Sequence, residues 1–206
     1  KINIAFDVYI GEAPSSPVEN TFNYQQVENK PEVDVIGAGP AGLFASLRLI
    51  ELGYRPVLLE RGKQAGDRKK DIDLLESNHI LNKESNYCFG EGGAGTFSDG
   101  KLYTRSKKRG DISRILEIFY LHGAPESILY EAHPHIGSDK LPAVVSNIRN
   151  TILNAGGIIR FNTRVTDLGL SDGLMTHVLT DKQEKIRGQA YIFATGHSAR
   201  DVYYLL

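Results

Sequence analysis

Apolar residues along the chain fall into short runs that glycine and polar turns separate. Strand-like runs begin at Val33 and Pro56, and between them Leu43, Leu47 and Ile50 recur at helical spacing. Gly53 is well placed to end that helix. A strand, a helix and a second strand within about 30 residues predict a βαβ unit, and so a pair of parallel strands.

The same patterns predict the rest of the fold. Strands that start at residues 33, 56, 158 and 191 are expected to form one parallel sheet, with an antiparallel meander over residues 164–189 inserted into it. The predicted fold class is therefore α/β, with a Rossmann-like sheet. Further helices are predicted near 71–81, 111–122, 141–155 and at the end of the chain, and further strands near 158–161, 164–170, 174–180, 186–189 and 191–194.

The N-terminal part has a different pattern. Residues 2–10 alternate between apolar and other residues with period two, which predicts a strand, and residues 12–31 are rich in Pro, Ser, Asn and Gln. The chain also begins without a methionine. We therefore expect a fragment, in which residues 1–31 are a strand and connector from an upstream region. Residues 32–206 are expected to be a dinucleotide-binding domain truncated at its C-terminus.

The turn after the first predicted strand carries Gly37, Gly39 and Gly42 in the pattern G-x-G-x-x-G. Gly37 permits a tight turn, Gly39 lets the backbone approach a phosphate, and Gly42 lets the helix pack closely on the strand. A lone pattern of this kind is weak evidence. Here the strand, the helix and the second strand agree with it, so we expect a dinucleotide site.

Two further features fit this site. Pro40 is tolerated in the first turn of a helix, where a phosphate meets free N–H groups. Glu60 ends the second strand, where a carboxylate is expected to accept hydrogen bonds from ribose hydroxyls. Asp34 departs from the pattern, because it places a charge in a strand that parallel sheets keep apolar; we expect it near the strand's open end.

A glycine-rich loop spans residues 88–100 and includes five glycines from Gly90 to Gly100. Such a loop can bring main-chain N–H groups together on an anion or a flat ring, although a flexible surface loop has the same composition. We expect cofactor contacts in it. Lys101 has two open interpretations: a positive charge near the reduced flavin, or a plain surface lysine. The candidate contacts in this region are Gly93, Gly95, Thr96, Ser98 and Lys101.

A family resemblance distinguishes FAD from NAD. The turn GAGPAG, the strand end LLERG and the segment IFATG at 192–196 resemble the FAD site of glutathione-reductase-like flavoproteins. Residues 87–105, YCFGEGGAGTFSDGKLYTR, and 194–201, ATGHSARD, resemble the predicted FAD-dependent dehydrogenases. This resemblance covers nearly all of the chain, although members of that family are considerably longer.

The resemblance implies the place of the cofactor. It adds Ala41 of GAGPAG and Arg61 of LLERG to the expected FAD contacts. It also implies that the Val165 backbone contacts adenine, and that the glycine-rich loop runs along the pyrophosphate towards the isoalloxazine. Thr195 and Gly196 would lie near the pyrophosphate or the flavin, and His197 near the flavin edge.

Composition narrows the classes of partner. A net charge of -1 gives no electrostatic reason to expect nucleic acid or an anionic membrane. No apolar stretch approaches a membrane span, and no signal-peptide pattern is present. A single cysteine excludes an internal disulfide and suits a reducing compartment. We therefore expect a cytoplasmic protein whose partners are a small-molecule electron donor and acceptor.

Two candidate chemistries receive little support. Cys88 has no second cysteine, so a dithiol mechanism within this chain is excluded, and most lone cysteines are small buried hydrophobes. His133 and His135 have no third ligand at suitable spacing, so no metal site is predicted. The sequence identifies no catalytic residue.

The expected function is an FAD-dependent oxidoreductase of dehydrogenase type, whose flavin accepts a hydride from a reduced donor, with NAD(P)H as one candidate. Three alternatives stay open: a flavin-dependent enzyme that modifies a macromolecule such as RNA, a non-catalytic dinucleotide-binding module, and an NAD-binding dehydrogenase domain without flavin. The electron acceptor, the choice between NADH and NADPH, and the oligomeric state do not follow from the sequence.

Overall fold

The computed structural model describes residues 10–11, 22–102 and 110–206. The strand predicted over residues 2–10 therefore lies outside the described residues, except for its last position. The described helices are α1 (Pro40–Glu51), α2 (Ala65–Asn78), α3 (Ile112–Leu121), α4 (Leu141–Asn154) and α5 (Arg200–Leu205). The strands are β1 (Glu32–Ile36), β2 (Arg55–Leu59), β3 (Ile158–Arg160), β4 (Val165–Ser171), β5 (Leu174–Thr180), β6 (Lys185–Ile186) and β7 (Ala190–Phe193).

Four strands form a parallel sheet in the order β3-β2-β1-β7. In the centre of this sheet Val35 lies opposite Leu58 of β2 and Ile192 of β7. β4, β5 and β6 form a separate antiparallel sheet, which the chain inserts between β3 and β7. The predicted fold class, a Rossmann-like parallel sheet with an inserted antiparallel meander, is confirmed.

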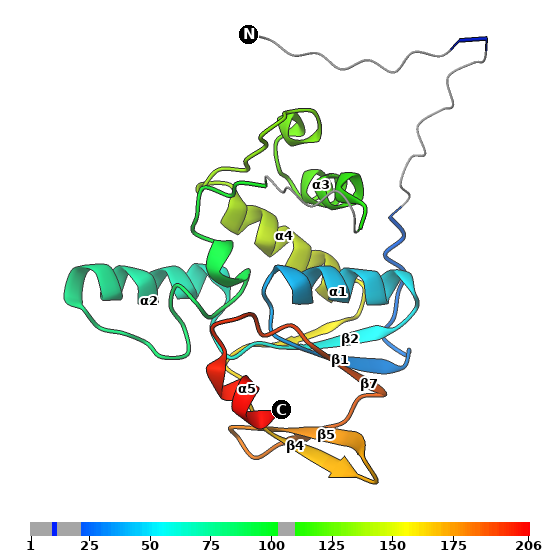
Figure 1. The fold of residues 1–206 in the computed structure, drawn as a ribbon, viewed down its shortest axis with the longest axis vertical. Coiled ribbons are helices and arrows are strands. Elements are labelled where there is room, and N and C mark those ends of the chain that lie inside the picture. The colour runs from blue at the N-terminus through cyan, green and yellow to red at the C-terminus, as the bar shows by residue number, and fades with distance from the viewer. Residues whose placement is uncertain (1–9, 12–21, 103–109) are drawn as a thin grey trace.

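The parallel sheet is covered on both faces (Figure 1). α1 and α4 pack on one face, where Val35, Leu47 and Ile148 belong to one buried core. The antiparallel sheet and α5 cover the other face, where Ile36, Leu59 and Val178 belong to a second core. Successive side chains of a strand point to opposite faces, so the neighbours Val35 and Ile36 enter different cores.

The described part of the predicted connector, residues 22–31, packs against the domain. Val27 is completely buried, and its N–H donates to the Ala155 carbonyl at 2.8 Å. The Gln26 side chain donates to the carbonyl of Asn154, the last residue of α4. This segment is therefore part of the folded domain rather than a loose linker.

The helix predicted near residues 71–81 is wrong at its boundaries. α2 begins earlier because tertiary contacts fix its first turn: the Ala65 N–H donates to the Glu91 carboxylate at 2.7 Å, and Arg68 is completely buried. His79 then takes a left-handed conformation (φ 56°) and ends the helix. The other helices and longer strands lie close to their predicted positions, while the strand predicted over 186–189 is the two-residue β6.

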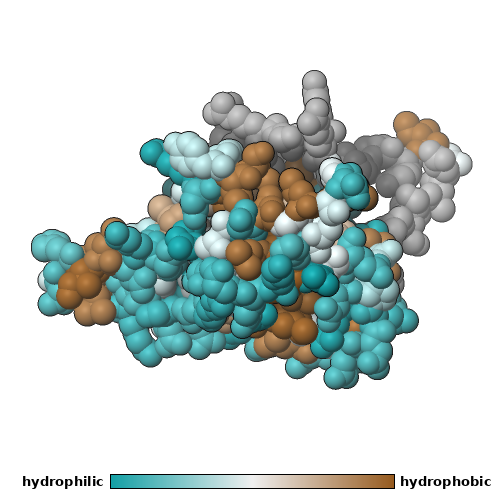
Figure 2. All heavy atoms as spheres, turned by 90° about the horizontal axis from the view of Figure 1, so that it is seen from below, coloured by the Kyte–Doolittle hydropathy of each residue, from teal (hydrophilic) through white to brown (hydrophobic). Residues whose placement is uncertain are grey.

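The side of the molecule on which the antiparallel sheet and α5 lie is largely hydrophilic, and apolar patches interrupt it (Figure 1 and Figure 2). Leu170 of β4 and Leu174 of β5 are exposed near their connecting turn. α2 projects from the side of the domain (Figure 1) and exposes Leu74. In the described parts of the chain, no helix is long and apolar enough to cross a membrane.

Asp34 does not lie at the open end of its strand, as the sequence suggested. It is the middle residue of β1, it is completely buried, and it lies opposite Val57 and Tyr191. Burial, and to a smaller extent the charge of Glu32, raise the pKa of its carboxyl group to about 6, with the Gly188 backbone acting in the opposite direction. A Cβ at Gly188 would lie 2.9 Å from the Asp34 carboxyl carbon.

This pKa predicts a pH-dependent effect of Asp34→Asn. A carboxyl group with a raised folded-state pKa stabilises the fold fully below its unfolded pKa, about 4, and loses that contribution as pH rises through about 6. The uncharged amide should therefore raise the free energy of unfolding by about 2 kcal/mol at pH 8 and by little at pH 4. Urea unfolding at several pH values measures this difference.

Asp73→Asn is the matched control, because Asp73 is exposed on α2 and pairs only with a surface lysine among the described ion pairs. Its effect should be small at every pH. A stability difference for Asp34→Asn that does not change between pH 4 and pH 8 would contradict the buried, proton-sensitive carboxyl group.

Candidate functional site

A cavity of about 510 Å³ opens at the C-terminal ends of β1, β2 and β7, within the range of small-ligand sites. In open parallel sheets, ligands bind in the crevice at these strand ends. The cavity is lined by Gly37, Gly39, Pro40, Ala41, Glu60, Arg61, Gly93, Val165, Thr195, Gly196 and His197, all of them predicted contacts. Its other lining residues include Cys88, Phe89, Gly90, Thr163, Arg164, Val202 and Tyr203.

Two glycines of the turn are needed by the protein itself. Gly37 has φ +107°, and a Cβ there would lie 2.5 Å from the Ala194 carbonyl oxygen at the end of β7. A Cβ at Gly42 would lie 1.8 Å from the Gly37 carbonyl oxygen, so α1 approaches the strand only because this side chain is absent. Both positions follow the steric roles that the sequence predicts for them.

Gly39 is different. The nearest atom to a Cβ at Gly39 is the Gly93 Cα, 3.9 Å away, so packing within the chain does not require glycine here. Gly39 lines the cavity, and a side chain at this position would fill space that a ligand can use. The cavity therefore has a cradle, an open space beside the Gly39 backbone, which fits a phosphate group.

The N-terminus of α1 faces the same space. The first bond of this helix runs from the Leu43 N–H to the Gly39 carbonyl at 3.0 Å. The N–H groups of Ala41 and Gly42 precede that bond, and Pro40 has no N–H. Free N–H groups and the helix dipole favour an anion at this point.

The Glu60 carboxylate organises the segments around the cavity. It is almost fully buried and accepts hydrogen bonds from the N–H groups of Ala38 (2.8 Å), Gly62 (2.8 Å) and Gly90 (3.1 Å). A carboxylate has about four acceptor positions, so three bonds leave capacity for one more donor. The ribose contact predicted for Glu60 stays a prediction, and the structure adds a second role that the sequence did not reveal.

An ionic network surrounds the exit of β2. Arg61 pairs with Glu84 (2.7 Å) and with Asp201 of α5 (3.0 Å), and Arg164 pairs with the other oxygen of Glu84 (3.2 Å). The Arg61 guanidinium also lies over the Phe89 ring, 4.2 Å from its centre. Segments far apart in the sequence are thereby held around one cavity.

Arg164 is a lining residue that the sequence reasoning missed. Its Nε atom is buried and has no hydrogen-bond partner within the described ranges. A buried donor without a partner is costly, so this atom marks an unsatisfied polar group next to the cavity. Arg164 directly precedes Val165, a predicted adenine contact, and this neighbourhood could have indicated from the sequence that Arg164 lines the cavity.

The glycine-rich loop reaches the cavity through only part of its length. The Gly92 N–H donates to the Ala38 carbonyl at 2.8 Å, which places Gly93 beside the G-x-G turn. Gly95, Thr96 and Ser98 are not lining residues. The buried Thr96 hydroxyl donates to the Glu91 carbonyl, and the Ser98 hydroxyl donates to the Gly95 carbonyl. Their cofactor contacts stay predictions, and their hydroxyl groups have partners within the loop.

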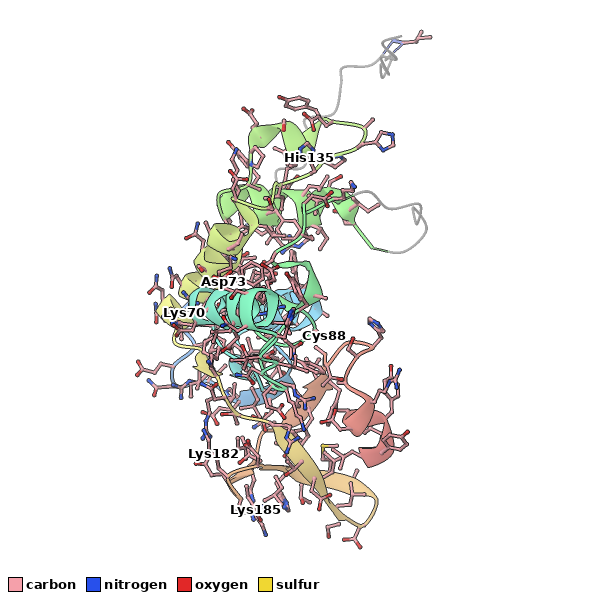
Figure 3. The ribbon with its side chains drawn as sticks, turned by 90° about the vertical axis from the view of Figure 1, so that its left-hand side faces the viewer. Lys70, Asp73, Cys88, His135, Lys182 and Lys185 are labelled. Carbon is pink, nitrogen blue, oxygen red and sulfur yellow. The ribbon has the colours of Figure 1, made fainter. Side chains whose placement is uncertain are left out.

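Lys101 lies on a second cavity, of about 540 Å³, lined by Asp99, Lys101, His133, Pro134 and His135. It pairs with Asp99 at 2.9 Å and is largely exposed. Figure 3 shows His135 well separated from Cys88 of the first cavity. The flavin role of Lys101 stays a prediction. No group of three or more His, Cys, Asp or Glu side chains that could hold a metal ion occurs among the described residues.

Comparison with known sequences finds an uncharacterised relative. No protein-family model matches the chain. An uncharacterised protein of Clostridium beijerinckii is 41% identical over 179 residues, which are 87% of this chain and 33% of that protein. The chain thus spans about a third of the length of the relative it matches.

Solved structures are similar at low sequence identity. Thermovibrio ammonificans THI4 is 17% identical, with a TM-score of 0.51 over 84% of this chain and 60% of that one. CtdE in complex with FAD is 18% identical, with a TM-score of 0.45 over 84% of this chain and 41% of that one. The similarity to THI4 shows the fold.

The hydrogen bonds of Glu60 predict the effect of Glu60→Ala. The substitution leaves three N–H groups without their acceptor, so it should lower the free energy of unfolding of the cofactor-free protein by about 2–3 kcal/mol. Glu84→Ala is the control, because it removes a partly exposed carboxylate and should cost less than about 1 kcal/mol. Urea unfolding compares the two; equal effects would show that Glu60 does not organise these segments.

Proposed function

We propose that this chain is the FAD-binding part of a flavin-dependent oxidoreductase of dehydrogenase type. The observation that carries the proposal is the cradle at Gly39. There a cavity at the strand ends meets the free N–H groups of α1, and the chain's own packing leaves room that a side chain would fill. A cofactor pyrophosphate fits this position.

The remaining walls suit the rest of a dinucleotide. Glu60 has one acceptor position left for a ribose hydroxyl, and Val165 at the start of β4 lines the same cavity. Arg164, directly before Val165, also lines this cavity. These groups support an adenosine near Glu60 and Val165, with the pyrophosphate at the N-terminus of α1.

FAD is favoured over NAD by the segments that converge here. Thr195 and Gly196 after β7 and Gly93 of the glycine-rich loop line the cavity together with the fingerprint turn. These are the segments whose sequences resemble the predicted FAD-dependent dehydrogenases. An NAD-binding domain needs only the fingerprint, so the additional glycine-bearing walls support the flavin dinucleotide.

Bound FAD would supply the redox chemistry, by accepting a hydride from a reduced donor and passing electrons to an acceptor. The chain's own residues would bind and orient it: the α1 N-terminus at the phosphates, Glu60 at the ribose, and the loop wall around Gly93 along its length. NAD(P)H is the proposed donor. His197 lines the cavity but has no assigned catalytic role.

The alternatives predict different results. An NAD-binding domain would be colourless, and a non-catalytic module would hold a dinucleotide without being reduced by NADH or NADPH. An RNA-modifying enzyme needs a basic surface, which a net charge of -1 does not favour. The visible spectrum of the purified protein, with chromatography of the released cofactor, tests the proposal; a protein that neither contains nor takes up FAD contradicts it.

Gly39→Val tests the phosphate position. A valine side chain would occupy the cradle, so FAD retention should fall at least about tenfold, while the thermal unfolding midpoint of the cofactor-free protein changes little. Gly66→Val on α2 is the matched control, because a Cβ there meets no atom within 4 Å and Gly66 is not a lining residue. Unchanged flavin content in Gly39→Val would overturn the assignment.

A further inference from the structure

Arg68 is a fully buried arginine on α2, and its guanidinium points into the loop that forms one cavity wall. Every acceptor that it contacts belongs to residues 86–96. These acceptors are the carbonyls of Asn86 (2.8 Å), Tyr87 (3.1 Å), Gly90 (3.4 Å), Glu91 (2.7 Å) and Gly93 (2.8 Å), and the Thr96 hydroxyl (3.2 Å). One side chain therefore fixes the path of the whole segment.

The loop is shaped to receive this side chain. Gly90 has φ +116°, and a Cβ at Gly90 would lie 2.4 Å from the Arg68 Cδ. Gly90 and Gly93, whose carbonyls bond to Arg68, also line the cavity. At Gly90 and Gly93 a single residue therefore separates the cavity from the Arg68 guanidinium.

The Arg68 side chain forms no direct salt bridge among the described ion pairs. Its hydrogen-bond acceptors are carbonyl and hydroxyl oxygens, while the nearby Glu91 carboxylate pairs with Arg149 at 2.7 Å. Burial lowers the pKa of Arg68, and the charges of Glu60 and Glu91 act against that effect. An arginine stays protonated in proteins, so a positive charge lies buried behind the wall.

We propose that Arg68 is a positioning residue for the dinucleotide. It holds the wall at Gly90–Gly93 against the G-x-G turn, and its buried charge favours a pyrophosphate dianion in the adjacent cavity. This inference rests on the proposed function. It assigns a role to an α2 residue that does not line the cavity.

The geometry requires a guanidinium rather than any cation. The acceptors lie on several sides of one planar group, which has five N–H donors, whereas a lysine ammonium has three at a single point. Arg68→Lys therefore keeps the charge and loses much of the loop anchoring. Arg68→Met loses both.

The experiment is a calorimetric titration of cofactor-free protein with FAD, ADP and adenosine. Arg68→Lys should raise the Kd for FAD about tenfold, and Arg68→Met more than this. The preference for ADP over adenosine should survive in Arg68→Lys and fall in Arg68→Met, because only the methionine variant loses the charge. A purely structural role of Arg68 would leave that preference unchanged in both.

Lys70→Met is the matched control. Lys70 lies on the same helix (Figure 3), carries the same charge and pairs with the exposed Asp67 at 2.8 Å. Its FAD affinity should stay within about twofold of wild type. An equal loss in Lys70→Met would show that net charge, and not the position of Arg68, determines affinity.

Thr96→Val covers the case in which the Arg68 variants do not fold. It removes one acceptor of Arg68 with little change of shape, and should raise the Kd for FAD about threefold. If wild type and Arg68→Met bind FAD equally well, the inference is wrong and the proposed function stands. If Arg68→Met does not fold, the same conclusion follows from a Thr96→Val variant that binds FAD as well as wild type. If wild type does not take up FAD, the proposed function fails and the inference falls with it.

Discussion

The structure around the cavity depends on one buried carboxylate. A buried charge is costly unless it is hydrogen bonded, and Glu60 meets this requirement with N–H groups from three separate segments. The turn after β1, the exit of β2 and the start of the glycine-rich loop must therefore come to the same point. The cavity is the space that remains between these segments at the C-terminal ends of the parallel strands.

Other buried charges extend this constraint outwards. Arg68 holds the loop from behind, and Glu91 joins that loop to the start of α2 and, through Arg149, to α4. Such interactions contribute little net stability, because desolvation offsets them; their effect is to favour one arrangement over its alternatives. The glycine-rich segment has few apolar side chains, so these charges act together with its backbone hydrogen bonds to keep it in a single shape.

The sequence was sufficient for the βαβ unit, the four strands of the parallel sheet and the inserted meander, because strand and helix periodicity and glycine sterics are local properties. It failed where distant contacts decide the outcome. Arg68 stands in the charged run Arg68-Lys69-Lys70, which is typical of a solvated surface, and only the folded loop buries it. The burial of Asp34 was misjudged and the role of Arg164 was missed for the same reason. The position of Lys101 depends on its antiparallel backbone bridge to His135, which is distant in the sequence.

The insertion of the meander has a consequence for synthesis on the ribosome. β1 pairs with β7 along Val33–Ala190 and Ile36–Phe193, and the carbonyl of Ala194 packs against Gly37. At translation rates of about 5–20 residues per second, the fingerprint turn emerges on the order of ten seconds before the strand that completes its site. During that interval the edge of β1 that β7 later covers is unpaired, so the nascent chain presents an open strand edge to mispairing until β7 arrives.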